Sequence, residues 1–190
     1  MDHLFTKEAY QDFVDHQASL PRNQWVGHRY YWEIFGIKPY TSILDMGAST
    51  GGNLLWYSYR EHRVVGIEPA RECIDVFEAE ATRVPADMIE RMEMHHCLVE
   101  DFSSEERFDY VLCGELLEHV RDPQEIVSKA SEHLRGGGQM LVATLLNNGT
   151  RKRVRDCDFP DLRQWAKVAG MALTWREQFK GIRLARIIKP

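Results

Sequence analysis

Residues 43–54 read Ile-Leu-Asp-Met-Gly-Ala-Ser-Thr-Gly-Gly-Asn-Leu, an apolar run that leads directly into a glycine-rich loop and then a helix. A second apolar run, residues 63–68, ends on Glu68, 23 residues after Asp45. In a nucleotide-type site, glycines let backbone N–H groups approach the cofactor, and an acid at the end of the next strand accepts hydrogen bonds from ribose hydroxyls. The two runs therefore predict a βαβ unit whose crevice lies at the carboxyl ends of its strands.

The detail of the loop distinguishes between cofactors. A dinucleotide fingerprint reads Gly-x-Gly-x-x-Gly and faces a pyrophosphate, whereas this loop reads Asp45-x-Gly47-x-Ser49-x-Gly51. A carboxylate at its start suits a cofactor with a cationic amino-acid end. The pattern resembles the first motif of class I S-adenosylmethionine-dependent methyltransferases, usually Asp-x-Gly-x-Gly-x-Gly, with Ser49 in place of the middle glycine.

Three further segments resemble that family in the same order. Residues 108–120, Phe-Asp-Tyr-Val-Leu-Cys-Gly-Glu-Leu-Leu-Glu-His-Val, are similar to its fourth-strand motif. Asp122-Pro123 and the following helix match its next step, and residues 134–142, Leu-Arg-Gly-Gly-Gly-Gln-Met-Leu-Val, match its fifth-strand segment. The resemblance covers residues 43–144 and implies S-adenosyl-L-methionine as cofactor and S-adenosyl-L-homocysteine as product.

The resemblance also implies which residues would bind the cofactor. The amino-acid end would lie against the first loop, which contains Asp45, Gly47, Ala48, Ser49 and Gly51. The ribose would lie at Glu68 and Pro69, and the adenine in the turn formed by Glu100, Asp101 and Phe102. The channel beside the sulfonium would be lined by Cys113, Gly114 and Glu115. Each group also has a structural interpretation: a strand-to-helix turn that needs positive φ, a solvated acid, a polar loop, and a small buried cysteine.

Glu115, Glu118 and His119 are spaced i, i+3 and i+4, which would place them on one face of a short helix. His119 is our candidate general base, since a histidine can accept a proton near neutral pH. A Glu-x-x-Glu-His segment also occurs in ubiquinone-pathway O-methyltransferases and in metal-dependent enzymes that methylate the 3′ end of small RNAs. The RNA enzymes complete their metal site with a histidine well downstream, and the only later one here is His133, so no metal is predicted. In the structural interpretation, Glu118 and His119 simply orient the loop.

Length and composition predict one soluble domain over residues 1–190. The resemblance implies a helical cap over 1–38 and a Rossmann-like core over 39–190. The chain is 44% hydrophobic and 28% charged, as is ordinary for a globular protein. No apolar run approaches the roughly 20 residues of a membrane span, and the first residues lack the features of a signal peptide. Four dispersed cysteines without a Cys-x-x-Cys pair predict a reduced, cytoplasmic protein.

Charge is distributed unevenly along the chain. Residues 1–133 carry 12 Lys/Arg against 25 Asp/Glu, whereas residues 134–190 carry 12 against 4. The run 151–155, Arg-Lys-Arg-Val-Arg, follows the fifth predicted strand, at the substrate rim of this fold. It could recognise a phosphate or carboxylate of an anionic acceptor, or it could be a solvated loop. Asn147 and Asn148 just before it could face the acceptor or serve as turn residues.

The pattern predicts an α/β fold with seven strands, at 42–46, 63–68, 93–98, 108–112, 139–144, 172–179 and 183–189. Helices are expected at 53–61, 71–83, 123–134 and 160–169, which alternate with the strands and therefore cover both faces of a parallel sheet. Lys180-Gly181 predicts a tight turn that makes the last two strands an antiparallel hairpin. The family resemblance implies the strand order 3-2-1-4-5-7-6. Two amphipathic helices are expected over residues 5–36. The resemblance implies that they cap the site, although their aromatic residues could equally pack against the sheet.

We therefore predict a methyltransferase that transfers a methyl group from S-adenosylmethionine to an oxygen or nitrogen of a small-molecule acceptor by in-line substitution. Two other classes stay open. One is an RNA methyltransferase with a basic acceptor face, although no Asn-Pro-Pro-Tyr-type motif follows the fourth strand. The other is a non-catalytic partner protein that keeps the fold. Ser49, in place of a family glycine, is the one feature that favours it. The acceptor and the oligomeric state are not predicted.

Overall fold

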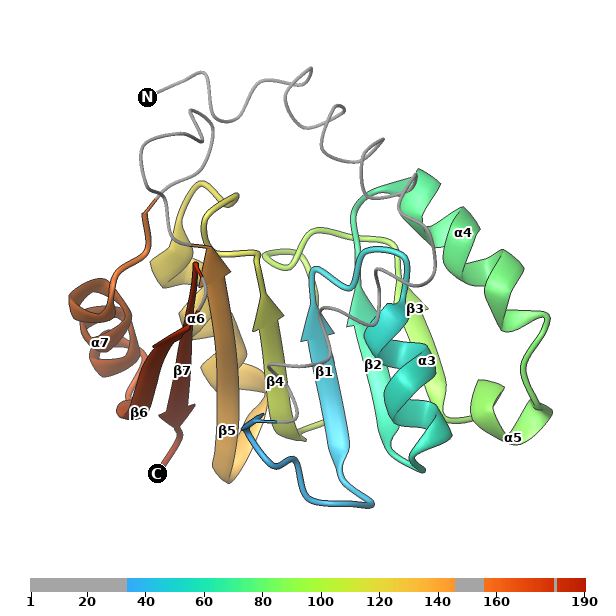
Figure 1. Cartoon of the computed structure of the whole chain (residues 1–190), viewed down its shortest axis with the longest axis horizontal. Helices are drawn as coiled ribbons and strands as arrows, with labels where there is room; N and C mark the ends of the chain where they lie inside the picture. The colour runs from blue at the N-terminus through green and yellow to red at the C-terminus, as the bar shows by residue number, and fades with distance from the viewer. Residues whose placement is uncertain (1–33, 146–155, 180) are drawn as a thin grey trace.

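A computed structural model of the chain describes residues 34–145, 156–179 and 181–190. Its centre is a seven-stranded sheet in the order β3-β2-β1-β4-β5-β7-β6 (Figure 1). The strands are β1 (Ser42–Met46), β2 (Arg63–Ile67), β3 (Met92–His95), β4 (Phe108–Gly114), β5 (Leu134–Leu145), β6 (Ala172–Phe179) and β7 (Ile182–Ile188). The helices between them are α3 (Gly52–Tyr59), α4 (Arg71–Ala81), α5 (Ala86–Ile89), α6 (Pro123–His133) and α7 (Phe159–Val168).

The predicted topology is confirmed. Strands β3, β2, β1, β4 and β5 are parallel, while β7 runs antiparallel to both β5 and β6. The last two strands form the expected hairpin, with Gly181 at φ 86° in its turn. Strand β7 is inserted between β5 and β6, so the last strand in the sequence occupies an interior position of the sheet.

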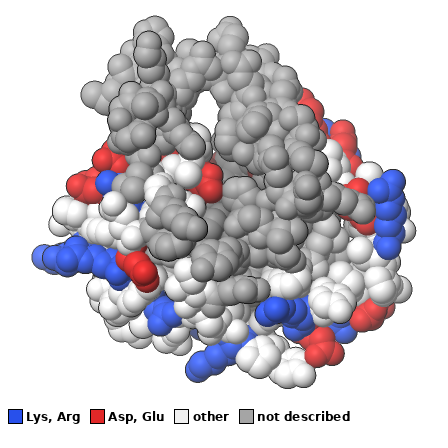
Figure 2. Space-filling model, in the orientation of Figure 1, with Lys and Arg blue, Asp and Glu red and all other residues white. Residues whose placement is uncertain are grey.

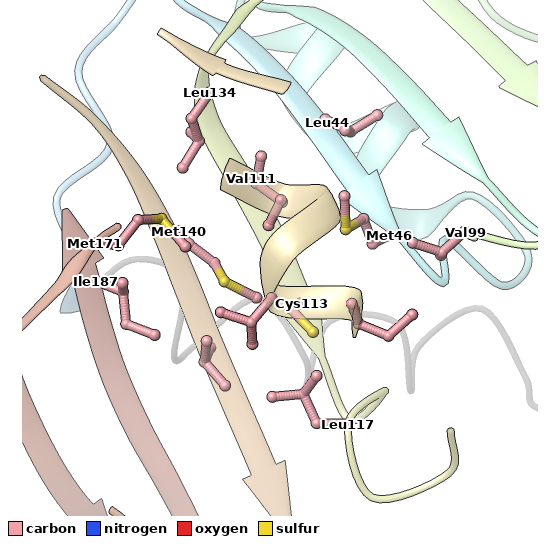
Figure 3. Packing of buried hydrophobic residues seen from close by; sticks show 14 of the residues in the cluster. Leu44, Met46, Val99, Val111, Cys113, Leu117, Leu134, Met140, Met171 and Ile187 are labelled. Atoms are coloured by element: carbon pink, nitrogen blue, oxygen red, sulfur yellow. The ribbon is translucent and has the colours of Figure 1, made fainter. Parts of the chain in front are cut away.

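Both faces of the sheet are buried, as its near-continuous apolar strands require. On one face, residues of β1, β4, β5 and β7 pack with α6 and α7, and Met46, Val111, Cys113, Met140 and Ile187 belong to this cluster (Figure 3). On the other face, a second cluster joins the sheet to α3. Neighbouring residues of β1 alternate between the two: Ile43 lies in the second cluster and Leu44 in the first. The sheet is therefore the middle of three layers, with α3 and α6 on opposite sides (Figure 1).

Helix ends follow their capping residues. The Asp122 side chain accepts the N–H groups of Gln124 and Glu125 at the start of α6. Asp158 and Asp161 form a reciprocal capping box at the start of α7. At the other end of α6, the Lys189 ammonium donates to the carbonyls of Ser131 and Leu134 at 2.6 and 3.0 Å. This places a cation at the negative end of the helix and ties the chain after β7 to it.

Several element boundaries differ from the sequence prediction, and one short helix was not predicted. Strand β3 ends at His95, not at residue 98, because the chain turns at 98–102, where the Asp101 N–H bonds the Leu98 carbonyl. Strand β5 begins at Leu134, directly after α6, because Leu134 already pairs with Phe108 before the register shifts. The one-turn helix α5 was not predicted, since four residues carry too little periodicity to be recognised.

Several expectations concern other parts of the chain. The two capping helices up to residue 33, Asn147, Asn148 and the 151–155 run lie outside the described residues. Within the described part, no helix combines the length and apolarity that a membrane crossing requires. The four cysteines are free thiols.

Gly51 should be essential for stability because two constraints meet there. Its φ is 74°, and a Cβ at this position would lie 2.2 Å from Cδ2 of the buried Phe77 ring. We expect Gly51→Ala to lower the free energy of unfolding by about 2–5 kcal/mol, from left-handed strain plus overpacking. The measurement is urea denaturation.

Gly170→Ala is the matched control. Gly170 has φ 70° but nothing within 4 Å of the added Cβ, so only the strain of about 1–2 kcal/mol should appear. If both variants lost the same free energy of unfolding, the Phe77 ring would have to move away from the added methyl group at no cost, and overpacking would not contribute.

Candidate active site

The glycine loop after β1 is held by the neighbouring strand. The N–H groups of Gly47 and Ala48 both donate to the Ile67 carbonyl, at 3.0 and 2.9 Å. Gly47 and Gly51 have φ of 78° and 74°, and Ser49 has φ 50°. A non-glycine residue rarely adopts the left-handed region, and such residues concentrate at functional sites. Ser49 therefore keeps the left-handed conformation expected of the middle glycine in the family motif.

Glu68 closes the loop against the end of β2. Its Oε2 accepts the N–H of Ser49 at 2.9 Å, and its Oε1 accepts the N–H of Ala70 at 2.8 Å. A carboxylate can accept about four hydrogen bonds, so these two leave acceptor capacity for a ligand. Burial is the largest influence on this carboxyl and raises its pKa, while the two N–H groups lower it. The residue predicted to bind ribose thus also positions the loop.

Asp45 lies at the other side of the loop and is only 2% exposed. Its Oδ2 accepts a hydrogen bond from the side-chain amide of Asn53, at 3.0 Å, in the first turn of α3. Burial raises the pKa of Asp45 to about 7; the bond from Asn53 opposes this rise and the neighbouring Glu68 adds to it. Two buried carboxyls, one on each side of the loop, form a site that favours a cation.

In the turn after β3, the apolar side chain exposed at the site is not the predicted one. The Phe102 ring is 3% exposed and packs between His95 and His133, with centroids at 5.1 and 4.9 Å. It therefore shapes the turn from inside the core. Glu100 is half-buried and Asp101 exposed. The exposed apolar side chain of this turn is Leu98, at 50%.

The end of β4 brings three predicted residues to the same edge of the sheet. The Cys113 thiol is fully buried beside Leu117 in the core on the α6 side (Figure 3). Burial raises its pKa well above the ordinary value, so it is a poor nucleophile. Gly114 is the last residue of β4, and Glu115 follows with φ 53° and its N–H on the Ala143 carbonyl at 2.7 Å. Cys113 could reach a ligand only through its main chain.

Residues 117–119 form a turn and Glu115 lies in a bend before it, so the predicted short helix is wrong. The Glu118 carboxyl is 1% exposed, and its Oε1 accepts the N–H of Leu145 at 2.8 Å, which links this turn to the end of β5. This contact supports the interpretation that Glu118 orients the loop. His119 is half-buried in the same turn. Throughout the described part of the chain, no group of three or more His, Cys, Asp or Glu side chains is placed to hold a metal ion.

A hollow of about 350 Å³ lies at the opposite edge of the sheet, where the strands begin, and Tyr40, Ser42 and Glu61 line it. Its three arginines are paired with acids: Arg63 with Glu93, Arg91 with Asp87 and Arg135 with Asp109. This hollow lies away from the glycine loop, and its arginines are already paired. The carboxyl edge of the sheet therefore remains the candidate site.

Sequence reasoning missed two residues at this edge. Asn53 was assigned only to a helix, and its place in the first helical turn after the loop was the available signal. Leu98 was predicted to be the last residue of a strand. Its exposure follows from the early end of β3.

Comparison with known proteins agrees with this geometry. A family model described as a methyltransferase domain matches residues 5–185. The chain belongs to this methyltransferase family. Among curated methyltransferases, it is 28% identical over 153 residues to the ubiquinone biosynthesis O-methyltransferase of Coxiella burnetii (strain Dugway 5J108-111), an alignment covering 69% of this chain and 63% of the relative. The corresponding enzyme of Chromobacterium violaceum is 34% identical over 144 residues, with 72% and 50% covered. The chain thus spans about half to three fifths of the length of these relatives.

Solved methyltransferases share the fold. The glycopeptide N-methyltransferase MtfA in complex with S-adenosyl-L-methionine superposes with a TM-score of 0.72 at 12% identity, covering 87% of this chain and 94% of that one. The 1,6-didemethyltoxoflavin-N1-methyltransferase of Burkholderia thailandensis gives 0.71 at 18% identity, with 96% and 84% covered. CcbJ from Streptomyces caelestis gives 0.74 at 14% identity, with 92% of each chain covered.

Asp45 should reduce the stability of the ligand-free protein at neutral pH. Its folded pKa of about 7 lies above the unfolded value of 3.8, so its contribution is favourable below pH 3.8 and is lost as pH rises to 7. Asp45→Asn keeps an oxygen for Asn53 but cannot ionise. We expect the variant to exceed the wild type in stability by an amount that grows about 1.4 kcal/mol per pH unit from pH 5 to 7 and then levels off. Urea denaturation from pH 5 to 8.5 measures this.

Asp109→Asn is the contrasting control. Burial tends to raise the pKa of Asp109, but hydrogen bonds from Ser42 and the charge of Arg135 outweigh it and lower the pKa. Its substitution should therefore destabilise the protein at neutral pH. If the wild type were more stable than Asp45→Asn at pH 8, the pKa of the buried Asp45 carboxyl could not be raised by burial as we infer.

Proposed function

We propose that this protein is an S-adenosylmethionine-dependent methyltransferase that methylates a hydroxyl oxygen of a small-molecule acceptor. The observation that carries the proposal is the pair of buried carboxyls, Asp45 and Glu68, on either side of a loop with left-handed residues at the carboxyl edge of the sheet. Membership of the methyltransferase family supports the reaction, and relatives that act as O-methyltransferases in ubiquinone biosynthesis support a hydroxyl acceptor.

The residues of the loop fit this cofactor chemically. Asp45 would receive the ammonium of the amino-acid end, because a buried carboxyl is stabilised in its charged form by a cation. Glu68 would accept hydrogen bonds from the ribose, and Leu98 would offer an apolar surface to the adenine in the turn that contains Glu100 and Asp101. The N-terminus of α3 follows the loop directly and has no side-chain cap from Gly51.

The bound cofactor supplies a methyl group on a sulfonium, which already carries a good leaving group. The protein then needs mainly to align the acceptor oxygen with the methyl carbon and to exclude water. The hydroxyl proton must leave the acceptor during transfer. We assign its acceptance to His119, which lies in the turn that follows β4.

A nucleic-acid acceptor is less well supported. On the face shown in Figure 2, the Lys and Arg side chains of the described residues lie at separate places around the rim, with acidic side chains among them. Nucleic-acid binding uses a continuous basic face that neutralises several phosphates. The anionic character of the acceptor depends on the run 151–155, outside the described residues.

Removal of the Glu68 carboxyl should weaken cofactor binding. We expect calorimetry to give at least tenfold weaker binding of S-adenosyl-L-methionine and S-adenosyl-L-homocysteine to Glu68→Ala, about 1.4 kcal/mol. Both loop positioning and the ribose contact are lost in this variant. Glu68→Gln, which keeps one oxygen acceptor, should lose less.

Glu93→Gln is the control for a general effect on the sheet, because Glu93 lies on β3 and pairs with Arg63 at its surface. It should bind like the wild type. Absence of binding to the wild type at millimolar ligand would overturn the proposal and favour a non-catalytic partner protein.

Replacement of His119 tests its role as a base. With an acceptor found by screening phenols, catechols and amines, His119→Gln should lower kcat about 10²-fold or more, while the affinity for S-adenosyl-L-homocysteine stays within about twofold. The rate should be followed from pH 5.5 to 9. Retention of the wild-type kcat and of its pH profile would exclude His119 as the base.

A further inference from the structure

The Asp45 carboxyl is held by a neighbour that is not a charged residue. Asn53 donates its side-chain N–H to Oδ2 at 3.0 Å from the first turn of α3. No Lys or Arg within the described residues forms an ion pair with Asp45 or Glu68. The Asp45 carboxylate is therefore stabilised by a neutral donor, the Asn53 amide, and not by a cation.

The surroundings of Asp45 otherwise oppose its negative charge. Glu68 at the end of β2 repels it, and Cys113 on β4 is close enough for the two groups to influence each other. His96, at the end of β3, acts favourably on Glu68 rather than on Asp45. An amide N–H that bonds a carboxylate favours the ionised form, because a protonated carboxyl is a weaker acceptor.

We infer that Asn53 is a positioning residue that keeps the Asp45 carboxyl oriented and ready to ionise, so that cofactor binding releases one proton from Asp45 to solvent at a pH set by Asn53. The inference rests on the proposed function. The proton balance is simple: the neutral carboxyl gives its proton to water, and the ammonium of the ligand replaces it as the positive partner. No bond of the ligand changes.

The first experiment is calorimetric titration of S-adenosyl-L-homocysteine from pH 6 to 8.5, in buffers of different ionisation enthalpy, which counts released protons. Wild type should bind more tightly with rising pH, up to tenfold per unit, and reach a plateau above its midpoint. Asn53→Leu should move the midpoint upward by about one unit, and Asn53→Asp, which adds a second carboxylate, should move it further. The affinity lost at pH 7 should be largely recovered at pH 8.5.

Recovery at high pH distinguishes positioning from a structural role, because a damaged site would lose the same affinity at every pH. Tyr59→Ala is the matched control: Tyr59 ends the same helix and is 71% exposed, so its removal should leave the midpoint unchanged. Equal midpoints in the wild type and both Asn53 variants would overturn the inference.

A second measurement needs no ligand. Carbon NMR of the Asp45 carboxyl in the free protein should show its titration midpoint rise in Asn53→Leu, with thermal melting confirming that the variant is folded. If the chain bound no cofactor but this midpoint moved, the proposed function would fail while the role of Asn53 toward Asp45 would stand. If cofactor bound and the midpoint did not move, the inference alone would fail.

Discussion

The arrangement of this protein depends on two carboxyls that are buried at the edge of the sheet. Glu68 receives one N–H from the glycine loop and one from the chain that enters α4. It therefore fixes the end of β2, the loop and the start of the next helix relative to each other. Without such an acceptor, the N–H groups of Ser49 and Ala70 would lose their partner, and a buried N–H without a partner costs about 1–3 kcal/mol. The strain at Ser49 is tolerated because these contacts determine its conformation.

Asp45 illustrates how a site can oppose the stability of its own fold. Interior positions of a parallel sheet favour apolar side chains, and the other four residues of β1 include Ile43, Leu44 and Met46. A carboxyl in their row gains little from burial and must give up hydration. Such a residue is expected where a ligand later supplies the missing charge. Burial of the Asp45 carboxyl destabilises the ligand-free protein, and a cationic ligand relieves that cost when it binds. The site therefore prefers a cationic ligand.

The fold could be predicted in outline because its signals are local and repeated. Buried strands alternate with helices, caps at Asp122 and Asp158 mark helix starts, and Gly181 marks the hairpin. The order of the strands came from the family resemblance instead. Details that depend on tertiary contacts were missed or wrong. The end of β3, the turn at 117–119 and the inward position of Phe102 each depend on packing against other elements, which no short window of sequence contains.

The candidate site shows the same division. Positions in the loop and at the strand ends follow from spacing, since parallel strands place their carboxyl ends together. The direction of each side chain does not. Cys113 and Phe102 point into the core, while Leu98 and Asn53 reach the edge without having been singled out.

The interior position of β7 has a consequence for how the protein is made. Strand β6 leaves the ribosome before β7, yet it has no place in the sheet until β7 has paired with β5. During synthesis, β6 and the outer edge of β5 therefore remain exposed and unpaired until β7 has been made. The pairing that joins them also brings Lys189 to the end of α6, so sheet closure and completion of that helix occur together. Vulnerability to aggregation and to proteolysis should thus be concentrated in the interval before the hairpin emerges.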